Sequence, residues 1–197
     1  IDAGKILVNQ INISRKEEYQ RAIHIGRVFQ DPMMGTAAGM EIQENLSLAY
    51  RRGQKRGLSW GVTKSEKVLY HEKLKMLGLG LENRMSSKVG LLSGGQRQAL
   101  TLLMATLVEP KLLLLDEHTA ALDPKNAALI LELTDRFIIE KKLTAMMITH
   151  NMSHAIKYGN RILMMHKGEI ILDISGEEKK NLTVEGLVKK FYDVKHE

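Results

Sequence analysis

A run of four leucines at residues 112–115, followed directly by Asp116 and Glu117, constrains the fold of this 197-residue chain most. A short apolar run bounded by polar residues is typical of a strand buried on both faces of a parallel sheet. Residues 145–149 form a similar run and predict a second buried strand, while residues 126–142 between them have the apolar spacing of an amphipathic helix. Strand, helix and strand in this order predict an α/β fold with a mainly parallel sheet.

The middle of the chain has a different pattern. Its apolar residues recur at helical rather than alternating spacing, which predicts an inserted helical lobe. We therefore divide the chain into a first core segment (1–31), a helical subdomain (32–106) and a second core segment (107–197).

Each core segment contains further expected elements. Residues 25–30 predict another buried strand, and residues 161–174 predict a hairpin that turns at Lys167 and Gly168. Residues 189–197 are mostly polar, so we expect the C-terminus to be frayed.

Composition limits the classes of protein to consider. The formal net charge of +6 suits an acidic partner such as a nucleotide, a nucleic acid or an anionic membrane surface. The absence of cysteine excludes disulfides, zinc ribbons and thiol catalysis within these residues. No stretch approaches the ~18 consecutive apolar residues of a membrane-spanning helix.

Five residues, Leu92, Ser93, Gly94, Gly95 and Gln96, come directly before the start of a predicted helix at Arg97. Adjacent glycines allow close approach of the backbone to a ligand and accept positive φ angles. The free N–H groups of a helix N-terminus, its dipole and a serine hydroxyl together favour a bound phosphate. The serine and glycines alone would equally suit an ordinary N-cap and loop, so both interpretations stay open.

Asp116 and Glu117 lie at the predicted end of the leucine strand, and open α/β sheets bind ligands at the carboxyl ends of their strands. Asp116 could hold Mg²⁺, because hard cations prefer oxygen ligands. Glu117 could polarise an attacking water. An acidic pair that merely ends a strand is the alternative when this segment is considered by itself.

Two further polar residues follow predicted strands. His150 comes after the strand at residues 145–149, and Gln30 ends the one at residues 25–30. If these strands neighbour the leucine strand, their ends lie at the same sheet edge as Asp116. A histidine here is more often structural than catalytic, and a glutamine amide by itself indicates little.

Taken in chain order, these segments resemble the nucleotide-binding subunit of ABC transporters, in an importer-like form. The matching features are a Q-loop glutamine (Gln30), a helical insert, the signature pentapeptide (92–96), a Walker B strand ending in Asp116 and Glu117, a D-loop (121–123) and a switch histidine (His150). The resemblance covers nearly the whole chain. It implies a P-loop NTPase-like α/β fold: a RecA-like core with a mainly parallel sheet and flanking helices, an inserted helical subdomain, and an absent N-terminal part.

The resemblance also implies ATP hydrolysis that drives transport. Two subunits of this family meet head to tail, and each ATP lies between the phosphate loop of one subunit and the signature of the other. Leu92 opens that signature, and Ser93, Gly94, Gly95 and Gln96 would contact the γ-phosphate of the partner's nucleotide.

The remaining roles are implied in the same way. Asp116 and Gln30 would serve Mg²⁺ and the lytic water, and Glu117 would be the general base. His150 would hold the γ-phosphate in register with Glu117, and Asp123 would act across the dimer. Such phosphoryl transfer depends on positioning and charge neutralisation.

The resemblance extends to partners and location. We expect a second nucleotide-binding subunit, transmembrane permease subunits and a solute-binding protein, with no nucleic acid as partner. The expected location is the cytoplasmic face of the cell membrane. The stretch at residues 116–124 is also similar to an importer subfamily whose binding proteins resemble amino-acid binders.

The sequence departs from the family at two points. The Walker A loop, Gly-x-x-x-x-Gly-Lys-Ser/Thr, does not occur in it, since Gly4 and Lys5 are followed by Ile6. We therefore expect a chain truncated before residue 1, which alone binds ATP weakly and does not turn it over. The second departure is His118, where the family usually has proline. A histidine could titrate near neutral pH there, although a tolerated variant is the simpler explanation.

Two other functions remain open at this point. One is a soluble ABC-type ATPase that acts on DNA or ribosomes, which the short lobe and the single cassette disfavour. The other is a non-catalytic partner that supplies only the signature half of a site. The missing Walker A loop would allow this function, but a truncated chain explains the missing loop more simply.

Overall fold

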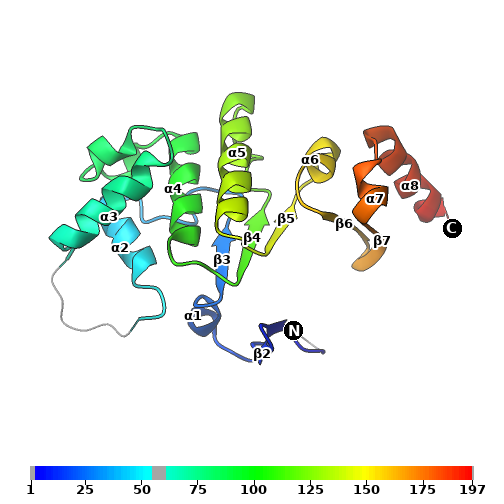
Figure 1. The fold of residues 1–197 in the computed structure, drawn as a ribbon, viewed down its shortest axis with the longest axis horizontal. Helices are drawn as coiled ribbons and strands as arrows, with labels where there is room; N and C mark the ends of the chain where they lie inside the picture. The colour runs from blue at the N-terminus through cyan, green and yellow to red at the C-terminus, as the bar shows by residue number, and fades with distance from the viewer. Residues whose placement is uncertain (1–2, 55–60, 197) are drawn as a thin grey trace. The chain divides into compact units, whose positions relative to one another are not determined.

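The computed structural model describes residues 3–54 and 61–196, which belong to two compact units, Ile1–Ile148 and Thr149–Glu197. The helices and strands carry the labels of Figure 1. The first unit contains β1 (Leu7–Val8), β2 (Ile11–Asn12), α1 (Glu18–Arg21), β3 (Ile25–Val28), α2 (Ile42–Tyr50), α3 (Lys64–Lys75), the 3₁₀ helices η1 (Leu81–Arg84) and η2 (Val89–Leu91), α4 (Gly94–Leu107), β4 (Leu112–Asp116), α5 (Pro124–Glu140) and β5 (Ala145–Ile148). The second contains α6 (Met152–Lys157), β6 (Arg161–His166), β7 (Glu169–Ser175), α7 (Gly176–Lys180) and α8 (Val184–His196).

The predicted parallel sheet is confirmed. Its strands lie in the order β3-β4-β5, and both pairings are parallel. In the register, Val28 is paired with Leu115, and Asp116 is paired with Ile148. The carboxyl ends of all three strands therefore meet at one edge of the sheet.

Helices α4 and α5 lie side by side against the sheet (Figure 1). Each begins with a capping side chain: Ser93 accepts a hydrogen bond from the backbone N–H of Gln96, and Asp123 accepts one from that of Asn126. Pro124 occupies the first position of α5, where its missing N–H costs nothing. Both helix N-termini are thus set by local sequence.

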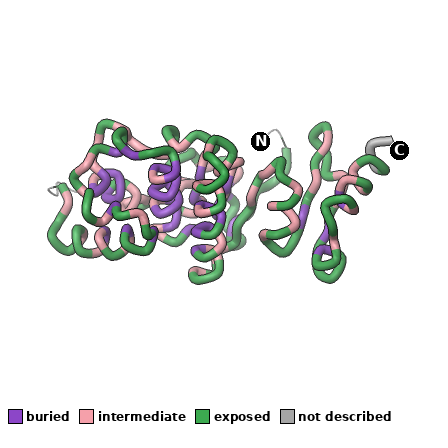
Figure 2. Tube along the Cα trace, turned by 90° about the horizontal axis from the view of Figure 1, so that it is seen from above, coloured by how far each residue is buried: buried purple, intermediate pink, exposed green. Residues whose placement is uncertain are grey.

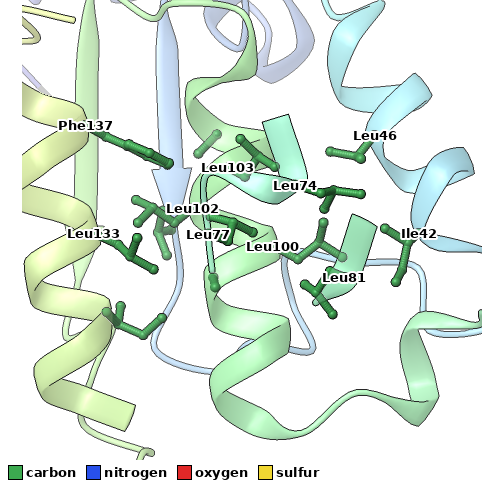
Figure 3. Packing of buried hydrophobic residues seen from close by; sticks show 14 of the residues in the cluster. Ile42, Leu46, Leu74, Leu77, Leu81, Leu100, Leu102, Leu103, Leu133 and Phe137 are labelled. Atoms are coloured by element: carbon green, nitrogen blue, oxygen red, sulfur yellow. The ribbon is translucent and has the colours of Figure 1, made fainter. Parts of the chain in front are cut away.

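One apolar cluster forms the core of the first unit. Figure 2 shows that most of the buried residues of the protein belong to this unit. Figure 3 shows Phe137 and Leu133 of α5 facing Leu102 of α4, with Leu74 of α3 and Leu46 of α2 on the other side of α4. The same cluster includes sheet residues such as Leu113 and Leu115, so the helices of the middle segment share a core with the sheet.

The second unit has its own small core, formed by Ile162, Ile174 and Leu187. The predicted hairpin is confirmed as β6 and β7, which pair antiparallel. Lys167 and Gly168 at the turn both have positive φ angles, 48° and 86°, as a two-residue hairpin turn matching the strand twist requires.

One expectation was wrong. β5 is not a buried strand: it forms an edge of the three-stranded sheet, and Met146 and Ile148 are 52% and 54% exposed. Residues 189–196 belong to α8, which continues to His196. Within residues 3–54 and 61–196, no helix has the length and apolar character needed to cross a membrane.

Candidate functional site

The predicted signature forms the N-terminus of α4. Ser93 Oγ accepts from the backbone N–H of Gln96 at 3.3 Å, and Gln96 Oε1 accepts from the backbone N–H of Ser93 at 3.2 Å. This reciprocal pair is a capping box, and such an N-cap contributes about 1 kcal/mol. The Ser93 hydroxyl uses a lone pair in this bond, so its hydrogen can still be donated.

The glycines behind Ser93 differ in their surroundings. Gly94 is exposed, whereas Gly95 is buried against the N-terminal turn of α5. A Cβ on Gly95 would lie 2.6 Å from both Cγ and Oδ1 of Asn126, so the side chain must be hydrogen here. Leu92 is buried in the core cluster and anchors the segment. The first N–H groups of α4 have no intrahelical acceptor, which suits an anion.

Asp116 lies at the end of β4 and forms an ion pair with Arg27 of β3, in which Nη2 and Oδ2 are 3.1 Å apart. The Arg27 guanidinium also lies 4.4 Å from the centroid of the Phe29 ring. Side-chain exposures of 40% for Asp116 and 50% for Arg27 leave the carboxylate accessible from solvent. Sequence patterns gave no sign of Arg27, because its partner is distant along the chain.

Glu117 has a left-handed backbone, with φ of +42°. For a residue with a Cβ this conformation costs on the order of 1 kcal/mol. Two backbone hydrogen bonds stabilise it: Glu117 N donates to Ile148 O at 3.1 Å, and Ala120 N donates to Glu117 O at 2.9 Å. The sharp turn takes the chain directly from the end of β4 into the loop before α5.

Gln30 is exposed and lies two residues beyond the end of β3. Because β3 and β4 are parallel neighbours in register, Gln30 and Asp116 are at the same edge of the sheet. His150 lies two residues beyond β5 and belongs to the second unit, where it is exposed. The structure thus places Gln30, Asp116 and Glu117 at one edge of the sheet. The placement of His150 and of the signature at one site with these residues stays a prediction.

His118 is buried, with 1% of its surface exposed, and its Nε2 lies 3.1 Å from Thr134 Oγ1 in α5. The Thr134 hydroxyl donates to Ile130 O at 2.7 Å, so Nε2 of His118 carries a hydrogen and donates to Thr134. Because His118 directly follows Glu117, this hydrogen bond attaches the chain beside Glu117 to α5.

Asp123 precedes α5 and binds Asn126 twice. Its Oδ2 accepts from Asn126 Nδ2 at 2.5 Å and its Oδ1 from the Asn126 backbone at 3.1 Å. These hydrogen bonds, first from the side chain and then from the backbone of Asn126, lower the pKa of Asp123. The same Asn126 lies against Gly95, so it joins the D-loop to the signature.

The donor set fits a nucleotide with Mg²⁺ better than a protein-enclosed metal. No group of three histidine or acidic side chains in the described residues is placed to hold a metal ion. Magnesium usually keeps several waters and takes one or two carboxylates together with substrate phosphates. Asp116 offers an accessible carboxylate of this kind, and the N-terminus of α4 offers donors for phosphate.

Comparison with known proteins identifies the family of this chain. Residues 1–120 match the sequence model of the ABC transporter family. The chain belongs to this family. It is an ATP-binding domain with the ABC ATPase fold, and its relatives include proteins of importers.

The relatives are longer than this chain. It is 47% identical over 189 residues to the tyrosine transport ATP-binding protein of Clostridioides difficile, covering 96% of this chain and 75% of that protein. It is 32% identical to the phosphate import ATP-binding protein PstB of Aeropyrum pernix, covering 85% of this chain and 65% of that protein.

Among solved structures, the chain is similar to the ATP-binding cassette MJ0796, captured as a dimer in a post-hydrolysis state with ADP and phosphate bound. The TM-score is 0.72 and the identity 27%, and the match covers 88% of this chain and 74% of the other. The likeness therefore includes most of both chains.

Proposed function

We propose that this chain is the ATP-binding subunit of an ABC importer and that it hydrolyses ATP at the interface of a head-to-tail dimer. The observation that carries the proposal is the arrangement within the first unit. The capped N-terminus of α4 lies against the start of α5, and the acidic end of β4 leads through the Glu117 turn into the loop before α5.

The residues at this site suit phosphoryl transfer. Ser93 and the N–H groups that follow it would bind the γ-phosphate of the nucleotide held by the partner subunit. Glu117 would take a proton from the attacking water, and Gln30 would orient that water. When bound, Mg²⁺ neutralises charge on the phosphates, and Asp116 is the residue here that would hold it.

Two roles rest more on family resemblance than on contacts in this chain. Asp123 would act across the dimer from its position at the start of α5, although its carboxylate is already bonded to Asn126. His150 would hold the γ-phosphate in register with Glu117. Support for the dimer comes from the MJ0796 structure, which is dimeric with ADP and phosphate bound.

The proposed setting is the cytoplasmic face of the cell membrane, on transmembrane permease subunits that receive cargo from a solute-binding protein. The tyrosine transport ATP-binding protein of Clostridioides difficile is 47% identical to this chain. We therefore propose an amino acid, with aromatic ones foremost, as the cargo. The Walker A loop does not occur within these 197 residues, and we propose that by themselves they bind ATP weakly and do not hydrolyse it.

Steady-state ATP hydrolysis by the full-length protein tests the proposal. Glu117→Gln removes the general base, and we expect kcat to fall by about 10²-fold or more. Glu132→Gln is the matched control, because Glu132 is exposed on the outer face of α5. Equal activity of the two variants would refute the assignment of Glu117.

A further inference from the structure

A buried glutamine of α4 connects the backbone beside two of the proposed catalytic residues. Gln98 Nε2 donates to Phe29 O at 3.1 Å and to His118 O at 2.6 Å, and the side chain has no exposed surface. Phe29 directly precedes Gln30, and His118 directly follows Glu117. One amide group therefore bridges the ends of β3 and β4.

The orientation of this amide is determined by its partners. Both are carbonyl oxygens, which only accept, so the NH₂ group must face them and each of its hydrogens serves one bond. Oε1 of Gln98 is buried without a hydrogen-bond partner among the described residues. An apolar side chain would remove that cost but would leave two carbonyls unpaired, at about 1–3 kcal/mol each. The two carbonyl acceptors therefore explain why an amide side chain occupies this buried position.

The same helix carries the signature at its start. Gln98 follows Ser93 within about 8 Å along the axis of α4, given the rise of about 1.5 Å per residue. The capping box and the packing of Gly95 on Asn126 hold that end of the helix. A shift of the α4 N-terminus on binding phosphate would therefore be passed to Gln98 and to both carbonyls.

We propose that Gln98 is a positioning residue, which fixes the backbone of Gln30 and Glu117 relative to each other and couples both to the signature helix. The proposal rests on the ATPase function proposed above. Gln98 lies outside the predicted site residues, and its signal in the sequence is a polar side chain at a position that the helix buries.

Three variants of the full-length protein test this role. Gln98→Met keeps the volume and removes both donors, and Gln98→His keeps one N–H donor. Thr106→Val is the matched control. Thr106 is also a fully buried polar residue of α4, but among residues 3–54 and 61–196 its hydroxyl bonds only to the backbone carbonyls of Leu102 and Leu103 in the same helix. Each variant is measured by amide hydrogen exchange and by steady-state ATP hydrolysis.

The role predicts faster exchange at residues 29–31 and at 117–119 in Gln98→Met, and a fall in kcat approaching 10²-fold with KM unchanged, since small misplacements can cost that much. Gln98→His should lie between this variant and the wild type, and it decides the question if Gln98→Met does not fold. Thr106→Val should match the wild type in both measurements.

Exchange and kcat of Gln98→Met equal to those of Thr106→Val would overturn the proposal, as would a change confined to KM. The two proposals fail separately. If Glu117→Gln leaves hydrolysis unchanged in the same assay, the proposed function is wrong, and hydrogen exchange alone then decides whether Gln98 holds the two segments.

Discussion

Gly95 of α4 lies so close to Asn126 of α5 that an added Cβ would stand 2.6 Å from the asparagine side chain. Asn126 is itself held by the carboxylate of Asp123. The contact locks the N-termini of the two helices together, and it places the signature beside the D-loop within one subunit.

Gly95→Ala should therefore displace α5 or the start of α4. Overpacking in a well-packed site typically costs about 1–3 kcal/mol, so we expect a loss of that size in the free energy of unfolding and a loss of ATP hydrolysis. Gly39→Ala is the control, because a Cβ on Gly39 meets nothing within 4 Å. Equal denaturation midpoints for the two variants would show that the contact is loose.

Ser93→Ala separates a structural cap from a phosphate ligand. Removing the cap should cost about 1 kcal/mol in chemical denaturation. Thr63→Ala removes the same kind of capping box from α3, where Thr63 Oγ1 accepts from Glu66 N at 3.2 Å. Both variants should lose similar stability, but only Ser93→Ala should also lose ATP hydrolysis. A parallel loss of activity in both would leave Ser93 as a cap alone.

Local sequence predicted the existence of the elements that carry the site better than their ends. The leucine run predicted β4, but the helix expected from Arg97 begins at Gly94, because the two glycines of the signature are themselves in the first turn of α4. The apolar run at β5 predicted a buried strand, and that prediction was wrong, since an edge strand and a central strand can share the same composition.

The contacts that organise the site could not be predicted from such patterns. Arg27 and Asp116 are 89 positions apart, and Gln98 and Phe29 are 69 apart. Such pairs depend on which strands and helices become neighbours, and that follows from the packing of the whole unit. The family resemblance supplied roles for residues but not these connections.

Tyr70 provides a prediction of pH dependence in the helical lobe. Burial raises the pKa of Tyr70 to about 12. The folded state keeps the phenol neutral while the unfolded chain, with a usual pKa near 10, ionises it. Stability from this residue is thus fully present below about pH 10 and is lost as the pH rises toward 12. Tyr70→Phe should lose less stability between pH 9 and 11 than the wild type does, whereas Tyr19→Phe, at an exposed tyrosine, should behave like the wild type.

Arg27→Ala should alter metal dependence more than stability. The ion pair with Asp116 is partly exposed, and such pairs contribute about 0–1 kcal/mol. Removing the competing cation should lower the Mg²⁺ concentration that gives half-maximal hydrolysis. Arg161→Ala breaks a comparable exposed pair with Asp173 in the hairpin and should not affect that concentration. An unchanged Mg²⁺ dependence in Arg27→Ala would show that Arg27 does not compete for Asp116.

The central claim is that ATP is shared between two copies of this subunit, and sedimentation of the full-length Glu117→Gln variant tests it most directly. With Mg²⁺ and ATP we expect a dimer that retains two nucleotides, and the additional change Ser93→Ala should abolish it. With ADP, the protein should be monomeric. A variant that binds ATP yet stays monomeric, or a dimer indifferent to both nucleotide and Ser93, would contradict the account.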